Sequence, residues 1–187
     1  APGVLALGAG VVIVATGGLP RDMAIEQGAG LAVSSWDIIA GDVKPAEDVL
    51  VYDDNGAHPG MSAAEVMGRG GAAVEVISPE RFFAPEMGGM NHVPYAQAFQ
   101  QHGVVTTINR RLVAVQREGA KLAAIIGSDF GPWRETRLVD QVVVEHGTLP
   151  LDELYLELKP GSVNGGEIDQ RAMIELHGVG KSFGATR

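Results

Sequence analysis

The sequence predicts an α/β protein of the Rossmann-like class: a doubly wound parallel sheet with an antiparallel hairpin as an appendage. Three observations predict it. Apolar, β-branched runs alternate with helix-like segments. The stretch from Val49 to Ser78 has the length and pattern of a βαβ unit. The 26 glycines among 187 residues, about twice the average use of glycine, indicate many tight turns.

The first twenty residues carry no charge, and Val11–Ala15 within them reads VVIVA. Such a continuous β-branched run predicts a central strand buried on both faces. Glycines and prolines interrupt the whole stretch, and Arg21 and Asp22 close it, so we expect neither a membrane span nor a signal peptide. The chain begins at Ala1 and reaches a strand almost at once, which is typical of a piece of something longer.

The central βαβ unit reads as four consecutive segments. Two residue patterns leave the start of its helix open: Ser62 and Glu65 have the spacing of a capping box, whereas Pro59 suits a first helical position. The segments are a strand at Val49–Tyr52, a polar turn at Asp53–Gly60, a helix at Met61–Arg69 stopped by Gly70-Gly71, and a strand at Ala73–Ile77.

The second half continues the alternation. Asn91–His102 is predicted as an amphipathic helix that ends at Gly103, and Val104–Ile108 as a third parallel strand. Leu112–Arg117 and Lys121–Ile126 flank a short loop containing glycine, which predicts a hairpin. Arg137–Glu145 is predicted as one further strand.

The turn after the first strand of the βαβ unit is where a dinucleotide fold places a pyrophosphate. The position is right, but of the glycines in the G-x-G-x-x-G fingerprint only Gly56 and Gly60 are present. Asp53 and Asp54 would repel a pyrophosphate that faced them, and Pro59 removes one amide donor. Retained NAD(P) binding and a structural relic therefore both remain open.

The acidic ribose clamp of a dinucleotide site is expected about twenty residues further on. Ser78 stands there, followed by Glu80 and Arg81. Ser78 with Arg81 suits a 2′-phosphate and Glu80 suits a free ribose, so the choice between NAD and NADP stays open.

Composition excludes several classes of function. Fourteen Lys and Arg against 23 Asp and Glu give a net charge of −9 without a basic block, which argues against a nucleic-acid partner. The absence of cysteine from the sequence excludes disulfides, thiolate metal sites and a catalytic thiol on this chain. The five histidines lack metal-ligand spacing, so no metal site is expected. Asp53 and Asp54 are adjacent on a strand and should point to opposite faces, so they cannot act as an acid–base pair on one substrate.

Several stretches together resemble the C-terminal nucleotide-binding half of bacterial NADH:flavin oxidoreductases, the family of trimethylamine dehydrogenase and 2,4-dienoyl-CoA reductase. The strongest likeness is to its dimethylglycine and N-methylproline demethylase-like branch, and it runs over residues 1–172. The stretches that carry it are VVIVATGGLPR (11–21), SSWDIIAGDV (34–43), VLVYDDNGAHPGMSAAEVM (49–67), VEVISPERFFAPEMGGMN (74–91) and VVEHGTLPLDELYLELKP (143–160).

This resemblance implies a division of labour. In the family, an N-terminal barrel of Old Yellow Enzyme type carries FMN, the substrate site and the catalytic residues, and a cysteine cluster carries a [4Fe-4S] centre. This chain contains neither part, so no catalytic residue is assigned to it, and the missing barrel is an expected partner.

The resemblance also implies three parts of the chain. Residues 1–45 and 137–172 would form part of an FAD- or ADP-type domain, and 46–136 an inserted NAD(P)H-type domain. Residues 173–187 form an atypical tail whose Gly178–Ser182 segment lacks the spacing of a P-loop. Thr16-Gly17-Gly18 would match the turn beside the flavin or ADP.

The predicted function is the nucleotide-binding portion of an NAD(P)H:flavin oxidoreductase, cytoplasmic and not catalytic as an isolated chain, with FAD or ADP and NAD(P)H as cofactors. The alternative is a degenerate Rossmann-like scaffold used for packing or for forming a homo-oligomer. The candidate cofactor-binding residues are Thr16, Gly17, Gly18, Asn55, Gly56, His58, Gly60, Ser78, Glu80 and Arg81.

Overall fold

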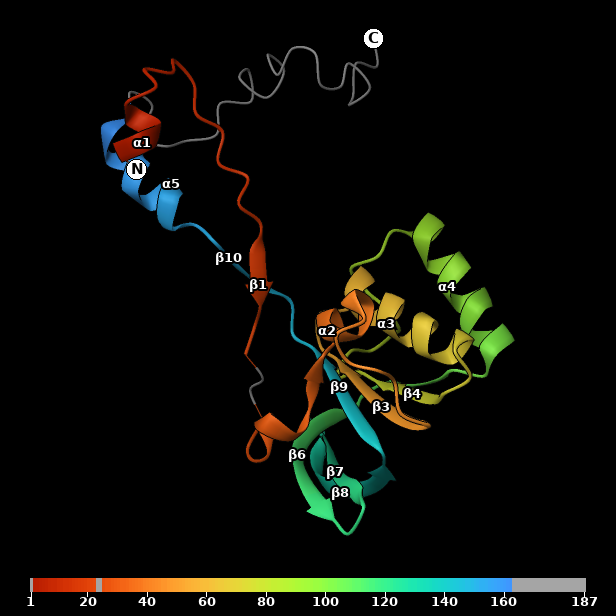
Figure 1. Ribbon diagram of the computed structural model, residues 1–187. Helices are drawn as coiled ribbons and strands as arrows, with labels where there is room; N and C mark the ends of the chain where they lie inside the picture. Colours follow the sequence, from red (N-terminus) through yellow and green to blue (C-terminus); the bar gives the residue numbers. More distant parts are fainter. Residues whose placement is uncertain (1, 23–24, 163–187) are drawn as a thin grey trace. The chain divides into compact units, whose positions relative to one another are not determined.

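The computed structural model describes residues 2–22 and 25–162 (Figure 1). The predicted tail, 173–187, lies outside the described residues. Backbone contacts divide the chain into a larger compact unit, Leu19–Leu149, and a smaller one formed by the residues on either side of it. The larger unit extends beyond the predicted inserted domain, 46–136, at both ends, and the nucleotide-domain limits stay a prediction.

A five-stranded parallel sheet lies at the centre of the larger unit. Its neighbouring strands all run in the same direction, which confirms the predicted α/β class with a parallel sheet. In spatial order the strands are β2 (Val33–Ser34), β9 (Gln141–Glu145), β3 (Asp48–Asp53), β4 (Ala73–Ile77) and β5 (Val105–Thr107).

The predicted βαβ unit is confirmed. Strand β3 leads into α3 (His58–Arg69), whose first turn contains Pro59, so the helix begins at the proline signal rather than at the later capping-box spacing. Gly71 follows the helix with a φ of 94°, a left-handed conformation that favours glycine. The chain then returns as β4, parallel to β3.

Two further helices complete the helical layer. The helix α2 (Ser35–Ala40) starts with a capping box in which the Ser34 hydroxyl oxygen accepts from the Trp36 N–H. The helix α4 (Gly89–His102) ends at Gly103, whose φ is 69°, and β5 follows, as the sequence predicts.

An antiparallel sheet covers the other side of the parallel sheet. It consists of β6 (Arg111–Glu118), β7 (Lys121–Ser128) and β8 (Gly131–Val139), and its first two strands are the predicted hairpin. The single strand predicted over Arg137–Glu145 is wrong. The chain leaves the antiparallel sheet at Asp140, whose N–H donates to the Asp48 carbonyl, and enters the parallel sheet as β9.

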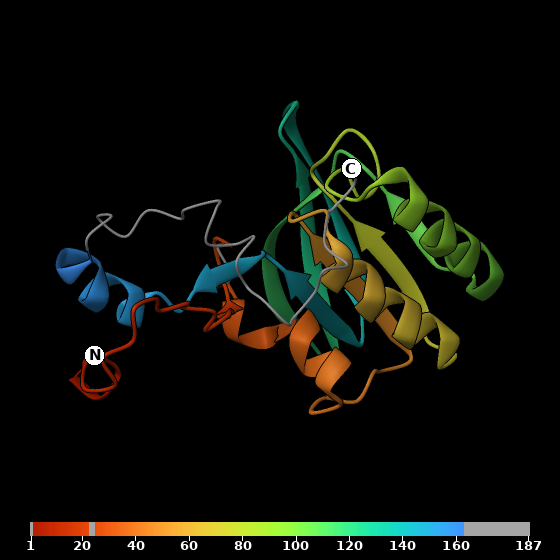
Figure 2. The same ribbon diagram turned by 90° about the horizontal axis from the view of Figure 1, so that it is seen from above.

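The helices α2, α3 and α4 lie on one face of the parallel sheet and the antiparallel sheet lies on the other (Figures 1 and 2). Alternate side chains of β3 therefore enter two different cores. Val49 and Val51 pack with the helices, while Leu50 and Tyr52 pack against the antiparallel sheet. The helical core includes Ile38, Met61, Met67, Phe99 and Val143, and the other core includes Ile77, Leu112, Val115, Ile126 and Val142.

The smaller unit contains α1 (Pro2–Leu5), α5 (Glu153–Leu158) and a 3₁₀ turn, Lys159–Gly161. The buried strand predicted at Val11–Ala15 is wrong: the segment is not a strand, and Val11 and Ile13 are 67% and 59% exposed. A central strand needs hydrogen-bonding neighbours on both edges, and the described sheets place none beside this segment.

Short elements complete the description. A two-stranded sheet pairs β1 (Gly18–Pro20) with β10 (Thr148–Pro150), and a 3₁₀ turn occupies Ala29–Leu31. Among residues 2–22 and 25–162, no helix has the length and apolar character needed to cross a bilayer.

Candidate functional site at the carboxyl edge of the parallel sheet

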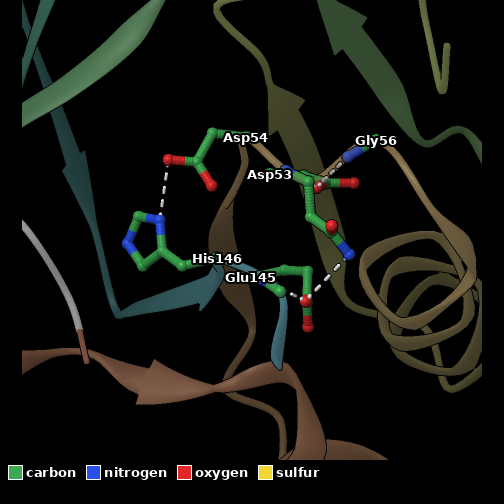
Figure 3. A network of polar contacts seen from close by, with 7 residues as sticks. Asp53, Asp54, Gly56, Glu145 and His146 are labelled. Carbon is green, nitrogen blue, oxygen red and sulfur yellow. Dashed lines mark hydrogen bonds and ion pairs between the residues drawn. The ribbon is translucent and has the colours of Figure 1, made fainter. Parts of the chain in front are cut away.

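The ends of β3 and β9 meet at one edge of the sheet, where Asp53 lies in register with Glu145. The two strands are parallel, so residues that follow them, among them Asp54, Gly56 and His146, gather at the carboxyl edge (Figure 3). The sequence-based placement of the Asn55 turn at this edge is confirmed.

Asp53 is a buried carboxylate, 1% exposed, that binds its own turn. Its Oδ1 accepts from the backbone N–H of Asn55 at 2.9 Å and of Gly56 at 2.8 Å. Its Oδ2 has no hydrogen-bond partner among the described residues. Burial raises the pKa of Asp53 from 3.8 to about 6; the two backbone N–H bonds lower it, and the charges of Glu145 and Asp54 raise it further.

Both glycines of the turn are required by packing inside the protein. Gly56 has a φ of 66°, and a Cβ there would lie 2.6 Å from Cδ of Pro85. A Cβ on Gly60, in the first turn of α3, would lie 2.5 Å from Oδ2 of Asp53. These glycines let the turn and the helix approach Pro85 and Asp53 closely.

Glu145 is a second buried carboxylate, 2% exposed, and it accepts hydrogen bonds from three residues. Its Oε1 accepts from the Asn55 side-chain amide at 3.2 Å and from the Gly147 N–H at 2.8 Å. Its Oε2 accepts from the Ser35 hydroxyl at the start of α2. Asn55 therefore contacts both buried carboxylates, Asp53 through its backbone and Glu145 through its side chain.

On the opposite side of β3, Asp54 faces His146. The Asp54 Oδ2 and His146 Nδ1 atoms are 2.8 Å apart, and the imidazole packs edge-on against Tyr52 with ring centroids 5.4 Å apart. His146 Nε2 is buried without a hydrogen-bond partner among the described residues. Burial raises the pKa of the Tyr52 phenol. Asp53 and Asp54 thus point to opposite sides, as the strand geometry predicts, and do not form an acid–base pair.

A cleft of about 580 Å³ opens beside this edge. Its size lies within the range of small-molecule sites, which is about 300 to 1,000 Å³. One cation and three carboxylates contribute to its lining, so its electrostatic character is mixed. The lining residues are Arg21, Asp22, Asp54, Asn55, Glu86, His146, Gly147 and Thr148.

The predicted residues of the glycine turn have different environments. Asn55 lines the cleft, whereas the backbone N–H of Gly56 donates to the Asp53 carboxylate. His58 starts α3, and its Nδ1 lies 3.2 Å from the Tyr95 hydroxyl of α4. Gly60 packs against Asp53.

The other predicted residues lie elsewhere. Ser78, Glu80 and Arg81 follow β4, and the Ser78 hydroxyl oxygen accepts from the Glu80 N–H at 3.3 Å. Thr16 donates its hydroxyl to the Leu151 carbonyl within the smaller unit, and Gly17 has a φ of 70°. The hydroxyl therefore ties the segment before Gly18 to Leu151.

Sequence reasoning missed several residues of the edge. Arg21, Glu86 and Thr148 line the cleft, and Ser35 holds Glu145. They come from four separate places in the chain, so spacing along the sequence gives no sign of them. One feature of the sequence could have indicated Glu145, namely that this carboxylate directly follows the apolar run that ends at Val144.

No family model matches the sequence. Among curated proteins, it is 52% identical over 164 residues to a probable N-methylproline demethylase of Rhizobium meliloti (strain 1021), covering 88% of this chain and 24% of that protein. It is 34% identical over 173 residues to an N,N-dimethylglycine/sarcosine dehydrogenase of Chromohalobacter salexigens, covering 89% and 25%. The chain spans about a quarter of the length of these relatives.

Solved structures share the fold. The 6-hydroxypseudooxynicotine amine oxidase of Pseudomonas geniculata N1 superimposes with a TM-score of 0.68 at 21% identity, over 86% of this chain and 25% of that one. The water-forming NADH oxidase of Lactobacillus brevis, bound to NADH, gives 0.57 at 17% identity, over 76% and 31%.

Proposed function

We infer that this chain, which belongs to the trimethylamine dehydrogenase and 2,4-dienoyl-CoA reductase family of NADH:flavin oxidoreductases, is the C-terminal nucleotide-binding portion of a longer flavin-dependent enzyme. The catalytic barrel of that enzyme, on this proposal, lies in the three-quarters of its length that this chain does not span. The names of the two relatives suggest an N-methylated amino acid as the substrate class of the parent.

The observation that carries the proposal is the cleft at the carboxyl ends of β3 and β9. In open α/β sheets, ligands bind in the crevice outside the carboxyl ends of the strands. The NADH oxidase that shares the fold is described as bound to NADH, which favours a nicotinamide nucleotide as the ligand.

The residues of the cleft fit the ribose part of such a nucleotide with one phosphate. Asp54, Glu86 and the Asn55 amide can accept hydrogen bonds from ribose hydroxyls, and Arg21 can pair with a phosphate. The bound nucleotide would supply hydride-transfer chemistry to the parent enzyme. A flavin or ADP beside Thr16–Gly18 remains part of the proposal, and its remaining contacts would come from the rest of the parent.

A second candidate function is a scaffold without a ligand, and the contacts of Asp53 favour it. The backbone N–H groups of Asn55 and Gly56 donate to this carboxylate, so they are not free to bind a pyrophosphate. A domain with this turn could keep its sheet and serve packing alone.

Calorimetric titration of the full chain with NADH, NADPH, ADP and FAD separates the two functions. We expect saturable binding of NADH or NADPH, and Arg21→Gln should weaken it about tenfold or more because a charge-assisted contact to phosphate is lost. Arg117→Gln, at an exposed position on β6, is the matched control and should leave affinity unchanged. Heats equal to those of dilution for all four nucleotides would favour the scaffold.

Gly56→Val is a poor test of the same turn. A side chain at Gly56 meets Pro85 and an unfavourable φ, so loss of binding in that variant would report misfolding rather than a lost contact.

A further inference from the structure

A second concave site lies at the turn between β7 and β8, on the antiparallel sheet. It is a pocket of about 380 Å³ and shares no lining residue with the cleft at the sheet edge. Its lining combines one cation, two aromatic rings and three small or rigid residues. These are Arg110, Ser128, Phe130, Gly131, Pro132 and Trp133.

The guanidinium of Arg110 is held in a defined orientation. Its Cζ lies 4.2 Å from the centroid of the Trp133 ring, and its Nη1 donates to the Asn109 carbonyl at 3.0 Å. The Arg110 backbone N–H donates to the Ser78 carbonyl at 2.8 Å, and Asn109 before it has a φ of 56°. Asn109 therefore has a left-handed backbone conformation directly before Arg110. The planar guanidinium of Arg110 lies over the Trp133 ring in a cation–π contact.

The two aromatic rings present surface to solvent. Phe130 is 78% exposed and Trp133 is 40% exposed. The Ser128 hydroxyl oxygen accepts from the Phe130 N–H at 3.2 Å, which fixes the start of the turn, and Pro132 stiffens it. Exposed large rings on a rigid turn lose little conformational entropy when a second ring stacks on them.

The charges at the pocket select the sign of a ligand. Its lining contains Arg110 and no carboxylate, whereas three carboxylates line the cleft at the sheet edge. The neighbouring Arg111 pairs with Asp129 at 3.1 Å, so these two charges offset one another. An anion therefore meets the guanidinium of Arg110 without an opposing carboxylate on the pocket wall.

We propose that this pocket is a second small-molecule site, which takes a planar aromatic ring carrying an anionic group. The ring stacks on Phe130 and Trp133, and the anion pairs with Arg110. The site goes beyond the proposed nucleotide function and does not depend on it, because its residues and its observations are separate from those of the cleft.

Trp133 is one of only two tryptophans in the sequence, so the Trp36→Phe variant makes it a single fluorescent reporter. Trp36 Nε1 has no hydrogen-bond partner among the described residues, and this background should fold normally. The probes are AMP and adenosine, which share a ring and differ in the phosphate. We expect saturable quenching by AMP and at least tenfold weaker binding of adenosine.

Four further variants assign the signal in that background. Arg110→Gln should weaken AMP binding at least tenfold, and Arg110→Lys, which keeps the charge and loses the planar fork, should weaken it less. Arg117→Gln should have no effect. Arg21→Gln should also have no effect, which separates this site from the cleft of the proposed function. Circular dichroism of each variant confirms that it is folded.

Three results would overturn the proposal. They are a lack of saturable quenching by AMP at millimolar concentration, equal binding of AMP and adenosine, and quenching that depends on Arg21 but not on Arg110. A quenching signal that arises in the cleft is recognised by its dependence on Arg21, whereas calorimetry with NADH measures nucleotide binding by the cleft itself.

Discussion

The two carboxylate oxygens of Asp53 differ in their hydrogen bonding. The side chain is almost fully buried, and one of its oxygens accepts two backbone hydrogen bonds while the other has no partner among the described residues. Desolvation exceeds the stabilising effect of the two N–H groups, so the pKa of Asp53 is raised to about 6. The carboxylate therefore costs stability when it is ionised.

This cost predicts a pH dependence. The pKa of Asp53 is higher in the folded chain than in the unfolded chain, so the unfolded state releases the proton first and stability falls as pH rises from about 4 to about 6. Asp53→Asn cannot ionise. We expect its free energy of unfolding, relative to the parent chain, to rise across this window by up to about 3 kcal/mol.

Urea unfolding of both proteins at pH 4, 5, 6 and 7 measures this difference. A difference that stays constant, or that shrinks as pH rises, contradicts the assignment of the raised pKa to Asp53. Asp42→Asn, at an exposed position after α2, controls for the loss of one negative charge.

Gly60 is required by the same carboxylate. Gly60→Ala places a methyl group 2.5 Å from Oδ2 of Asp53, and we expect a loss of about 1 to 3 kcal/mol in the free energy of unfolding. Gly89→Ala, in the first turn of α4 with open space around its Cβ position, is the control and should be neutral. Thermal melts of the two variants test this, and equal melting temperatures would refute it.

Residue roles were the hardest feature to predict from the sequence. The position of Asn55 at the carboxyl edge followed from the βαβ pattern, because parallel strands end at the same edge. The use of Gly56 and Gly60 did not follow, since a glycine required by Pro85 or Asp53 looks the same in sequence as one required by a phosphate.

At the scale of elements, β3 determines how the layers are arranged. Its side chains alternate between the helical core and the core against the antiparallel sheet. The sequence predicted β3, α3, β4, α4 and the β6–β7 hairpin, because each has a clear period and because glycines follow α3 and α4 and lie in the hairpin loop. The hairpin was predicted to be an appendage, because the apolar residues of β6 and β7 do not indicate which other surface they pack against.

The break between β8 and β9 was missed for a related reason. Leu138 and Val139 at the end of β8 are apolar, as are Val142–Val144 of β9, and only Asp140 separates the two strands. Local propensity cannot distinguish one long strand from two strands that belong to different sheets.

The antiparallel layer should contribute strongly to stability. Leu50 is fully buried in the core between the two sheets, so Leu50→Ala should lower the free energy of unfolding by about 2 to 5 kcal/mol. Leu138→Ala, at a position that is 48% exposed, should lower it by less than about 1 kcal/mol. Chemical denaturation compares them, and similar values would show that the layer packs loosely.

At the scale of the whole molecule, every buried residue of both cores lies within the larger unit, Leu19–Leu149. In the smaller unit no described residue is buried. The sequence predicted a buried strand in that smaller unit at Val11–Ala15, because a β-branched run has the same appearance whether or not its neighbours are present.

A shortened chain of residues 19–149 should therefore keep the unfolding transition of the full chain. We expect its melting temperature to lie within about 4 °C of the full chain, since a difference of about 1 kcal/mol corresponds to a shift of that order. Circular dichroism melts of both proteins measure this. A shortened chain that is unfolded at 25 °C would show that the flanking segments contribute to the cores.

The position of β3 has a consequence for isotope labelling. Its strand is bonded on both edges, by β4 and β9, and both of its faces are covered, so its amide protons reach deuterium only when the entire unit opens. The slow exchange of these few amides then measures the global free energy of unfolding in plain buffer, without any denaturant. The same measurement gives an independent value of this free energy for each variant.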